Sequence, residues 1–173
     1  MDILAHGLWT NAVFYLKYKR DKKQRLLAVL FGVLPDIVSF TPLVIYIIFT
    51  GVRFSPGLFQ GQHFWPFDYA VQSYNFTHSA IIFALVMLII TIIRKGKAYW
   101  PLWGWGFHIA IDIFTHPNFF STPFLYPLSN YRNYYAIRWT HPVFMLINYA
   151  LIVIVYVIIF RYRDKHPKLS AET

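Results

Sequence analysis

The sequence predicts an all-α protein, a polytopic membrane bundle of four transmembrane helices preceded by a short membrane-inserted helix. First, 57% of the 173 residues are hydrophobic and only 13% are charged, against roughly 45–50% and 25% in soluble domains. Second, the hydrophobic residues form runs comparable to the roughly 20 residues that cross a bilayer. Third, the net charge of +9 is gathered in short basic clusters beside these runs, a pattern typical of cytoplasmic loops. The length predicts a single domain over residues 1–173.

Composition also excludes several classes of function. The chain has no cysteine, so disulfides, thiolate catalysis and cysteine-ligated metals are excluded. The N-terminus lacks a basic region followed by a cleavable apolar core, and we expect no signal peptide. A basic chain invites a nucleic-acid partner, but clustering beside hydrophobic runs favours a membrane topology signal instead. We therefore expect the lipid bilayer as a partner and no nucleic acid.

The first half of the chain contains a short apolar segment and the first full span. Residues 2–16 are apolar but short, and we expect a short, tilted or partly inserted helix. The basic cluster Lys17–Arg25 follows and is expected in the cytoplasm. Residues 26–50 form a span in which Pro35 should break or kink the helix. The next residue, Asp36, predicts a polar cavity at membrane depth; alternatively, it caps a restarted helix.

Three more spans and two outer loops complete the predicted topology. The spans are residues 77–93, 98–115 and 140–160. The loops are residues 51–75, rich in aromatic side chains and suited to an interfacial belt or lid, and residues 116–139. Two further basic clusters follow the second and fourth spans: Arg94, Lys95 and Lys97, then Arg161, Arg163, Lys165 and Lys168. Four spans place all three basic clusters and the C-terminus in the cytoplasm.

Chemistry is concentrated in the stretch from Trp103 to Pro117. His108, Asp112 and His116 recur every four residues among apolar neighbours, so a helix places them on one face about 6 Å apart along its axis. Imidazole nitrogen and carboxylate oxygen suit zinc, manganese or iron. The alternative is a set of polar side chains that only bond one another in a packed interior. Ionisable groups inside a membrane are costly and are functional by default, which favours a metal site.

A repeated triplet extends this set. Aromatic-Thr-His occurs at residues 76–78, 114–116 and 139–141, each at the predicted outer end of a span. The predicted metal ligands of the outer half are His6, Asp36, His78, His108, Asp112, His116 and His141. Seven exceed the three or four protein ligands of one catalytic zinc ion. Either Asp112 bridges two ions, or some members orient the ligands.

This set predicts metal-assisted hydrolysis. A metal lowers the pKa of bound water and polarises a carbonyl or phosphoryl centre. Asp36 is the candidate base, with a histidine not needed as a ligand, such as His78, as the alternative. Arg138 or Arg132 in the second outer loop, or Arg53 in the first, is expected to hold an anionic headgroup, because arginine suits phosphate geometry.

The same residues carry a family resemblance. His6, the turn Gly32 to Asp36, Thr77-His78-Ser79 and the spacing of His108, Asp112 and His116 together resemble the YdjM-like membrane-bound metal-dependent hydrolases. The resemblance covers most of residues 1–120. It implies a small helical protein of the bacterial or archaeal cytoplasmic (inner) membrane with a divalent-metal hydrolase site, and it supplies no substrate.

More distantly, the order of histidines and aspartates is similar to the ligand order of zinc-dependent phospholipase C and P1-type nucleases. That similarity implies one metal site of His78, His108, Asp36 and Asp112, with Asp112 bridging to another that includes His116 and His141. Met145 stands where those enzymes carry a glutamate, so we expect one or two ions, most simply zinc.

We therefore expect a membrane-embedded hydrolase of an ester or phosphoester in a lipid-like substrate at the extracytoplasmic side. The alternative is a non-catalytic metal or proton conduit. A conduit needs polar groups through the cytoplasmic half, where residues 80–93 and 150–160 offer only Thr91 and Tyr156. A structural or partner-binding protein is a third interpretation, which the repeated triplet argues against. Haem is compatible with the histidines, but interleaved carboxylates favour a hard divalent ion.

Overall fold

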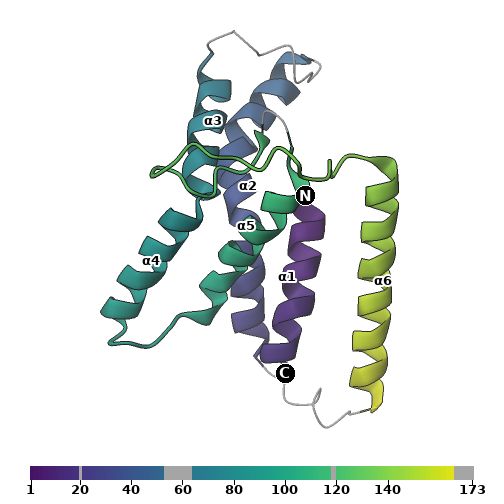
Figure 1. Ribbon diagram of the computed structural model, residues 1–173. Coiled ribbons are helices and arrows are strands. Elements are labelled where there is room, and N and C mark those ends of the chain that lie inside the picture. Colours follow the sequence, from purple (N-terminus) through teal and green to yellow (C-terminus); the bar gives the residue numbers. More distant parts are fainter. Residues whose placement is uncertain (20, 53–63, 118–119, 166–173) are drawn as a thin grey trace.

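The predicted all-α class is confirmed. The computed structural model describes residues 1–19, 21–52, 64–117 and 120–165, which contain helices and no strand (Figure 1). The elements are α1 (Ile3–Lys17), α2 (Lys22–Thr50), α3 (Trp65–Thr77), α4 (Ala80–Ile93), the 3₁₀ turn η1 (Trp100–Leu102), α5 (Trp103–Thr115) and α6 (Pro142–Lys165).

Helix α2 is the centre of the bundle, with α1, α3 and α5 packed against it (Figure 1). Two glycines permit the close approach. A Cβ at Gly104 of α5 would overlap the Ala28 carbonyl oxygen of α2, and one at Gly32 of α2 would meet the Thr10 hydroxyl of α1. Small residues at such crossings let helix backbones pack closely in membrane proteins. The functional residues of these helices are thereby brought together.

The predicted break at Pro35 does not occur. Helix α2 runs through Pro35 and Pro42 from Lys22 to Thr50, so Asp36 lies inside a helix and does not cap a restarted one. A proline removes one backbone hydrogen bond from a helix. Three neighbouring helices hold α2 on either side of Pro35, and packing of this kind stabilises helices more than intrinsic propensity does.

The predicted outer loop 51–75 is also partly wrong. Residues 65–77 form α3, whereas residues 53–63 lie outside the described part of the chain. Pro66 sits in the first turn of α3, where a missing N–H costs no helical hydrogen bond. The chain then bends by 59° between α3 and α4, and the Ser79 side chain caps α4 by accepting from the Ile82 N–H.

The expected count of four spans is not confirmed. Helices α2 and α6 are long and apolar enough to cross a membrane, and the bent pair α3–α4 makes a third span at most. Helices α4 and α5 have 14 and 13 residues, about 20 Å each, which is short of the roughly 30 Å hydrocarbon layer. Helix α1, with 15 residues, fits the short N-terminal helix that the sequence predicts.

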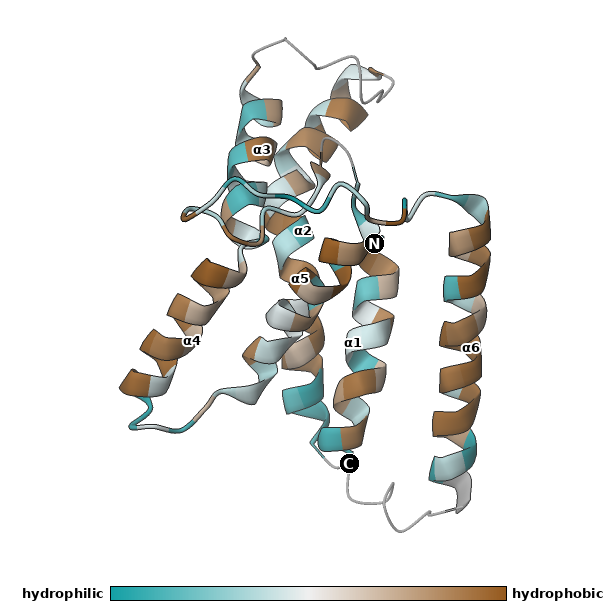
Figure 2. Cartoon of the chain, in the orientation of Figure 1, coloured by the Kyte–Doolittle hydropathy of each residue, from teal (hydrophilic) through white to brown (hydrophobic). Residues whose placement is uncertain are grey.

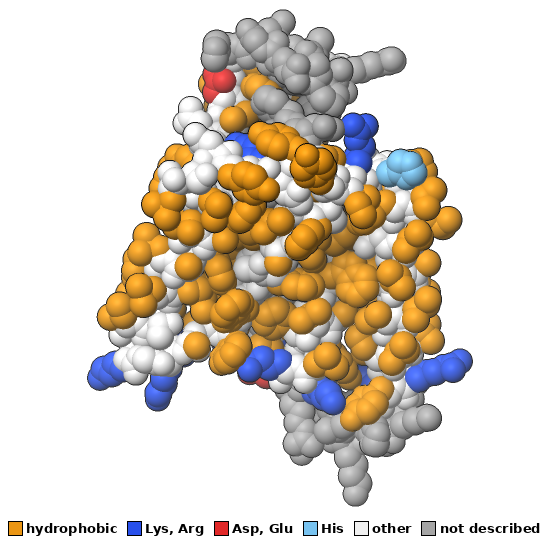
Figure 3. Space-filling view, viewed as in Figure 1, with side chains coloured by type: hydrophobic (Ala, Val, Ile, Leu, Met, Phe, Trp, Pro, Cys, Tyr) orange, Lys and Arg blue, Asp and Glu red, His pale blue; other side chains and the backbone are white. Residues whose placement is uncertain are grey.

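The surface agrees with a membrane location. Figure 2 shows α4 and α6 as largely hydrophobic along their lengths. Figure 3 shows apolar side chains over most of the visible face, with most visible lysines and arginines along its lower edge. Helix α6 packs against α1, where Trp9 Nε1 donates to Asn148 Oδ1 at 2.9 Å.

Candidate metal centre

Five buried ionisable side chains from four helices meet inside the bundle. His6 comes from α1, Asp36 from α2, His78 from the end of α3, and His108 and Asp112 from α5. Four of them are completely buried, and Asp36 is 5% exposed. His108 and Asp112 lie on one buried face of α5, as their spacing predicts, whereas the third predicted member of that face, His116, is the C-cap of the helix and has extended backbone.

Four of these residues offer ligand atoms that all lie within 4.8 Å of one another: Asp36, His78, His108 and Asp112. His78 Nε2 and His108 Nε2 are 3.0 Å apart. Asp112 Oδ2 lies 3.2 Å from His108 Nε2 and 3.5 Å from His78 Nε2. Asp36 Oδ1 lies 3.4 and 3.7 Å from the same two nitrogens. Two nitrogens and two carboxylate oxygens thus surround one point, and such ligands suit a divalent ion.

Hydrogen bonds on the far side of each ring fix where the imidazole protons lie. His108 Nδ1 is 2.8 Å from the Gly32 carbonyl oxygen, which only accepts, so Nδ1 carries the hydrogen. The Thr77 hydroxyl donates to the Ser73 carbonyl, so it accepts from His78 Nδ1 at 2.9 Å. In both neutral rings Nε2 then carries no hydrogen, and the Nε2 lone pairs of the two rings face each other. Only a proton or a cation between them relieves this arrangement.

Asp112 faces a second group of atoms with its other oxygen. Oδ1 lies 2.9 Å from His6 Nε2, 3.0 Å from His116 Nδ1 and 2.5 Å from the amino group of Met1. The His6 ring stacks on the His108 ring with centroids 3.8 Å apart. Asp112 therefore stands between two pairs of histidine nitrogens, and its Oδ1 also forms an ion pair with the Met1 amino group.

Unpartnered atoms provide a test of whether a cation fits. Asp112 Oδ2 and His6 Nδ1 are buried with no hydrogen-bond partner, although buried polar groups are normally bonded. A buried carboxylate oxygen without a donor is costly, and coordination to a metal removes that cost. Helices α3 and α5 also end at the cluster, with His78 and His116 as their C-caps. Helix C-termini carry partial negative charge and favour a cation. The residues present therefore fit a divalent ion.

The repeated triplet has a structural basis at two of its three occurrences. Thr77 and Thr115 each donate to the carbonyl four residues earlier, at 2.9 and 3.2 Å. Each hydroxyl also lies beside Nδ1 of the next histidine, at 2.9 Å for His78 and 3.4 Å for His116. The triplet thus ends a helix and orients the imidazole that follows it.

The third triplet does not reach the cluster. His141 is exposed in the turn before α6, and among the described residues no hydrogen bond or ion pair links its side chain to the cluster. The first two triplets form the C-terminal ends of helices, whereas this one precedes a helix. The prediction of His141 as a ligand therefore has no support in this geometry, and the proposed site excludes it.

Two of the predicted headgroup-binding arginines, Arg132 and Arg138, lie in the loop before α6, and the third, Arg53, lies outside the described residues. Arg132 is half-buried and donates to the Ser121 carbonyl oxygen at 2.6 Å and to Asn75 Oδ1 at 2.9 Å, so it braces this loop against α3. Arg138 is exposed. A cavity that borders Asp36 and His116 has neither arginine in its lining.

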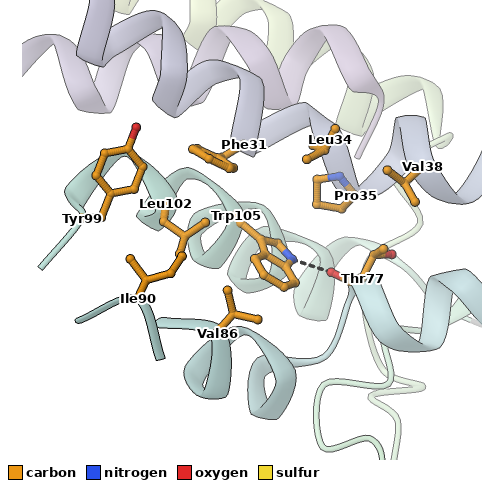
Figure 4. Close-up of a pocket in the computed structure, with 10 residues that line it drawn as sticks. All are labelled: Phe31, Leu34, Pro35, Val38, Thr77, Val86, Ile90, Tyr99, Leu102 and Trp105. Carbon is orange, nitrogen blue, oxygen red and sulfur yellow. Dashed lines mark hydrogen bonds between the residues drawn. The ribbon is translucent and has the colours of Figure 1, made fainter. Parts of the chain in front are cut away.

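Sequence reasoning missed the groups that orient the ligands. The Gly32 carbonyl lies three residues before Pro35, in the turn that a proline perturbs; this is a signal that could have identified it. The second group is Trp105, whose indole N–H donates to the Thr77 carbonyl oxygen at 2.5 Å (Figure 4). It anchors the end of α3 beside His78, at the edge of an apolar pocket that includes Phe31 and Leu102.

Comparison with known proteins identifies a family but no individual protein that matches. No curated protein and no solved structure matches the chain, so the distant similarity to phospholipase C and P1-type nucleases is not shown. The model of one family, described as YdjM inner membrane protein, matches residues 1–170. This match covers nearly the whole chain, including every residue of the cluster. The chain therefore belongs to the YdjM inner membrane protein family.

Proposed function

We propose that this protein is a membrane-embedded metal-dependent hydrolase that cleaves an ester or phosphoester of a lipid-like substrate. One observation carries the proposal. His78 Nε2, His108 Nε2, Asp36 Oδ1 and Asp112 Oδ2 converge as lone-pair donors, and the Nδ1 hydrogen bonds of both rings direct their hydrogens away from the centre. A site whose imidazole N–H groups all point away from its centre is suited to hold a metal ion.

The proposed ligands are the four residues of the cluster, with Asp112 as the bridge to His6 and His116. Zinc is the simplest ion for two imidazoles and two carboxylates, and manganese or iron suits the same donors. The atoms around Asp112 Oδ1 hold a second ion, or they orient the first set. A bound ion supplies electrophilic activation of the scissile group and of water near neutral pH.

Two residues of the chain face the side from which a substrate would come. Asp36 and His116 border a cavity, and their side chains are 7% and 13% exposed. In the proposed reaction Asp36 ligates the ion through Oδ1, and its other oxygen accepts a proton from water while the hydroxyl adds to the acyl or phosphoryl centre. The bond to the alcohol then breaks, and the alcohol oxygen takes the proton. His78 is fully buried, so the role of metal ligand suits it better than that of general base.

A conduit for ions or protons is less well supported. It needs ionisable groups that continue along the bundle away from the cluster. Among the described residues, the buried histidines and aspartates are the five of the cluster, and the other buried polar side chains are uncharged. The proposed topology places the basic ends of α1, α2, α4 and α6 in the cytoplasm and the cluster toward the extracytoplasmic side.

Metal content tests the proposal first. Elemental mass spectrometry of the detergent-purified protein, supplemented in turn with zinc, manganese and iron, should find near-stoichiometric metal in wild type. His108→Ala and Asp112→Ala should both lose it. His141→Ala is the matched control, since it removes an imidazole that lies outside the cluster, and it should retain the metal. Circular dichroism reports whether each variant is folded.

Hydrolysis is the second readout. The metal-loaded wild type should cleave ester or phosphoester bonds in a panel of lipids, and Asp36→Asn should lose activity. A folded wild type that binds no metal after supplementation overturns the proposal. So does a protein that binds metal equally well with and without His108 and Asp112.

A further inference from the structure

A cavity connects the candidate metal centre to the apolar surface of the bundle. Its volume is about 570 Å³, within the range of ligand sites. Asp36 and His116 form part of its wall, so the cavity reaches two residues of the proposed centre. Among the pockets within the described residues, the apolar one in Figure 4 and a third beside Trp100 and Trp103 contain no histidine or aspartate in their linings.

Apart from Asp2, the rest of the cavity wall is mainly apolar. Ile3 and Leu4 come from the first turn of α1, Phe40 from α2, and Phe120 and Trp139 from the loop between α5 and α6. Ile3 and Leu4 are 45% and 63% exposed. They therefore form a rim that is open to the surroundings of the bundle. A water-soluble substrate gains little from such a wall, whereas a hydrocarbon chain is stabilised by burial against it.

The position of the centre along α2 indicates whether lipid or water surrounds this rim. Asp36 is 14 residues beyond Lys22, the first residue of α2, and this distance along a helix is about 21 Å. The hydrocarbon layer is about 30 Å thick. In the proposed topology the basic start of α2 lies at one membrane surface, so Asp36 lies inside the hydrocarbon layer, near its middle. The exposed apolar rim then meets lipid chains, not water.

From these observations we infer that the cavity is a binding site for the hydrocarbon chain of a membrane amphiphile. This inference rests on the proposed function and names its substrate class. The chain enters sideways from the far leaflet between Leu4 and Phe40 and lies against the aromatic wall. The ester or phosphoester group reaches Asp36 and His116. Selectivity comes from the length of the chain, because the cavity offers few polar groups away from the centre.

A pair of substrates with one leaving group tests this inference. Methyl and hexadecyl 4-nitrophenyl phosphate release the same nitrophenolate and differ only in the alkyl chain. Leu4→Trp adds bulk at the exposed rim, and Leu16→Trp adds the same bulk at a 72% exposed position of the same helix. Wild type should favour the hexadecyl ester by at least tenfold in kcat/KM. Leu4→Trp should reduce this preference about tenfold, and Leu16→Trp should preserve it.

The Leu16→Trp control separates chain binding from simple enrichment of the long substrate in detergent micelles, since enrichment acts on every variant. Equal kcat/KM for the two esters, or equal preferences in the two variants, overturns the inference and leaves the hydrolase proposal standing.

If wild type cleaves neither ester, the hydrolase proposal fails for these substrates, and native mass spectrometry with hexadecylphosphonate tests the cavity by itself. One bound molecule in wild type and Leu16→Trp, lost in Leu4→Trp, supports the chain site. Absence of a bound molecule from wild type overturns it.

Discussion

Replacing Thr77 with valine tests the tautomer argument directly. Valine has nearly the shape of threonine and lacks only the hydroxyl that accepts from His78 Nδ1 at 2.9 Å. Without it, His78 is free to rotate or to carry its hydrogen on Nε2, where the metal is expected. Loss of a partner that orients a metal-bound histidine typically reduces affinity 10–100-fold, equivalent to about 1.4–2.7 kcal/mol. We expect a decrease in metal affinity within this range.

The structure also predicts a side effect and provides a control. The buried Ser39 hydroxyl lies 2.8 Å from the Thr77 hydroxyl and loses that partner, which should cost about 1 kcal/mol of stability. Thr41→Val removes the same type of bond, to the carbonyl four residues earlier, at an exposed site of α2 that has no histidine partner. The control should leave metal affinity unchanged. Thr115→Val should disturb the orientation of His116 less than Thr77→Val disturbs that of His78, because the contact between Thr115 and His116 is longer, at 3.4 Å.

The assay is competition for zinc against a chelator of known affinity, with circular dichroism and thermal unfolding of each variant. The decisive comparison is between Thr77→Val and Thr41→Val. If both bind zinc like wild type while remaining folded, the hydrogen bond from His78 to Thr77 does not set the geometry of the centre. If both lose zinc equally, the loss reflects general destabilisation of the helices, and the tautomer argument again fails.

Three further predictions concern the scaffold and its orientation. Gly104→Ala should destabilise the protein by about 1–3 kcal/mol in denaturant unfolding, because its Cβ would overlap a carbonyl oxygen of α2. Asn148→Leu removes the acceptor of the Trp9 indole N–H and should cost about 1 kcal/mol, measured in the same way; an unchanged midpoint would contradict that role. Because the chain has no cysteine, single cysteines report topology cleanly. An impermeant maleimide should label Asn130→Cys in intact cells and Lys97→Cys only after the membrane is opened, and the reverse pattern would refute the proposed orientation.

The sequence predicts the candidate centre better than the helices that carry it. The four-residue spacing of His108 and Asp112 is a local property of one helix, and it remains valid wherever that helix packs. Asp36 and His78 are predicted from their chemistry, since an ionisable side chain is costly inside a membrane and is retained there chiefly for function. Their convergence within 4.8 Å depends on how four helices pack, and no single segment encodes that.

His141 shows the limit of a local motif. Its triplet is the same in residue type as those of His78 and His116, but the threonine hydroxyl orients a histidine only where a helical turn precedes it. Helices α3 and α5 provide that turn at the first two triplets. The third stands before α6, with no helix behind it. The deciding property is whether the helix precedes or follows the triplet, and the three residues of the triplet do not specify this.

The unconfirmed span count and the buried centre have a common structural cause. Helices α3 and α5 have 13 residues each and stop beside Asp36, where their C-terminal histidines and partial negative charges face the cluster. Full spans through the same positions would continue their backbone hydrogen bonds past His78 and His116 and offer no helix end to a cation. Irregular backbone at membrane depth is tolerated only where protein or a cavity covers it. The helix break before Ser79 and the end of α5 are covered in this way, and the two short helices that end there carry three of the five residues of the centre, His78, His108 and Asp112.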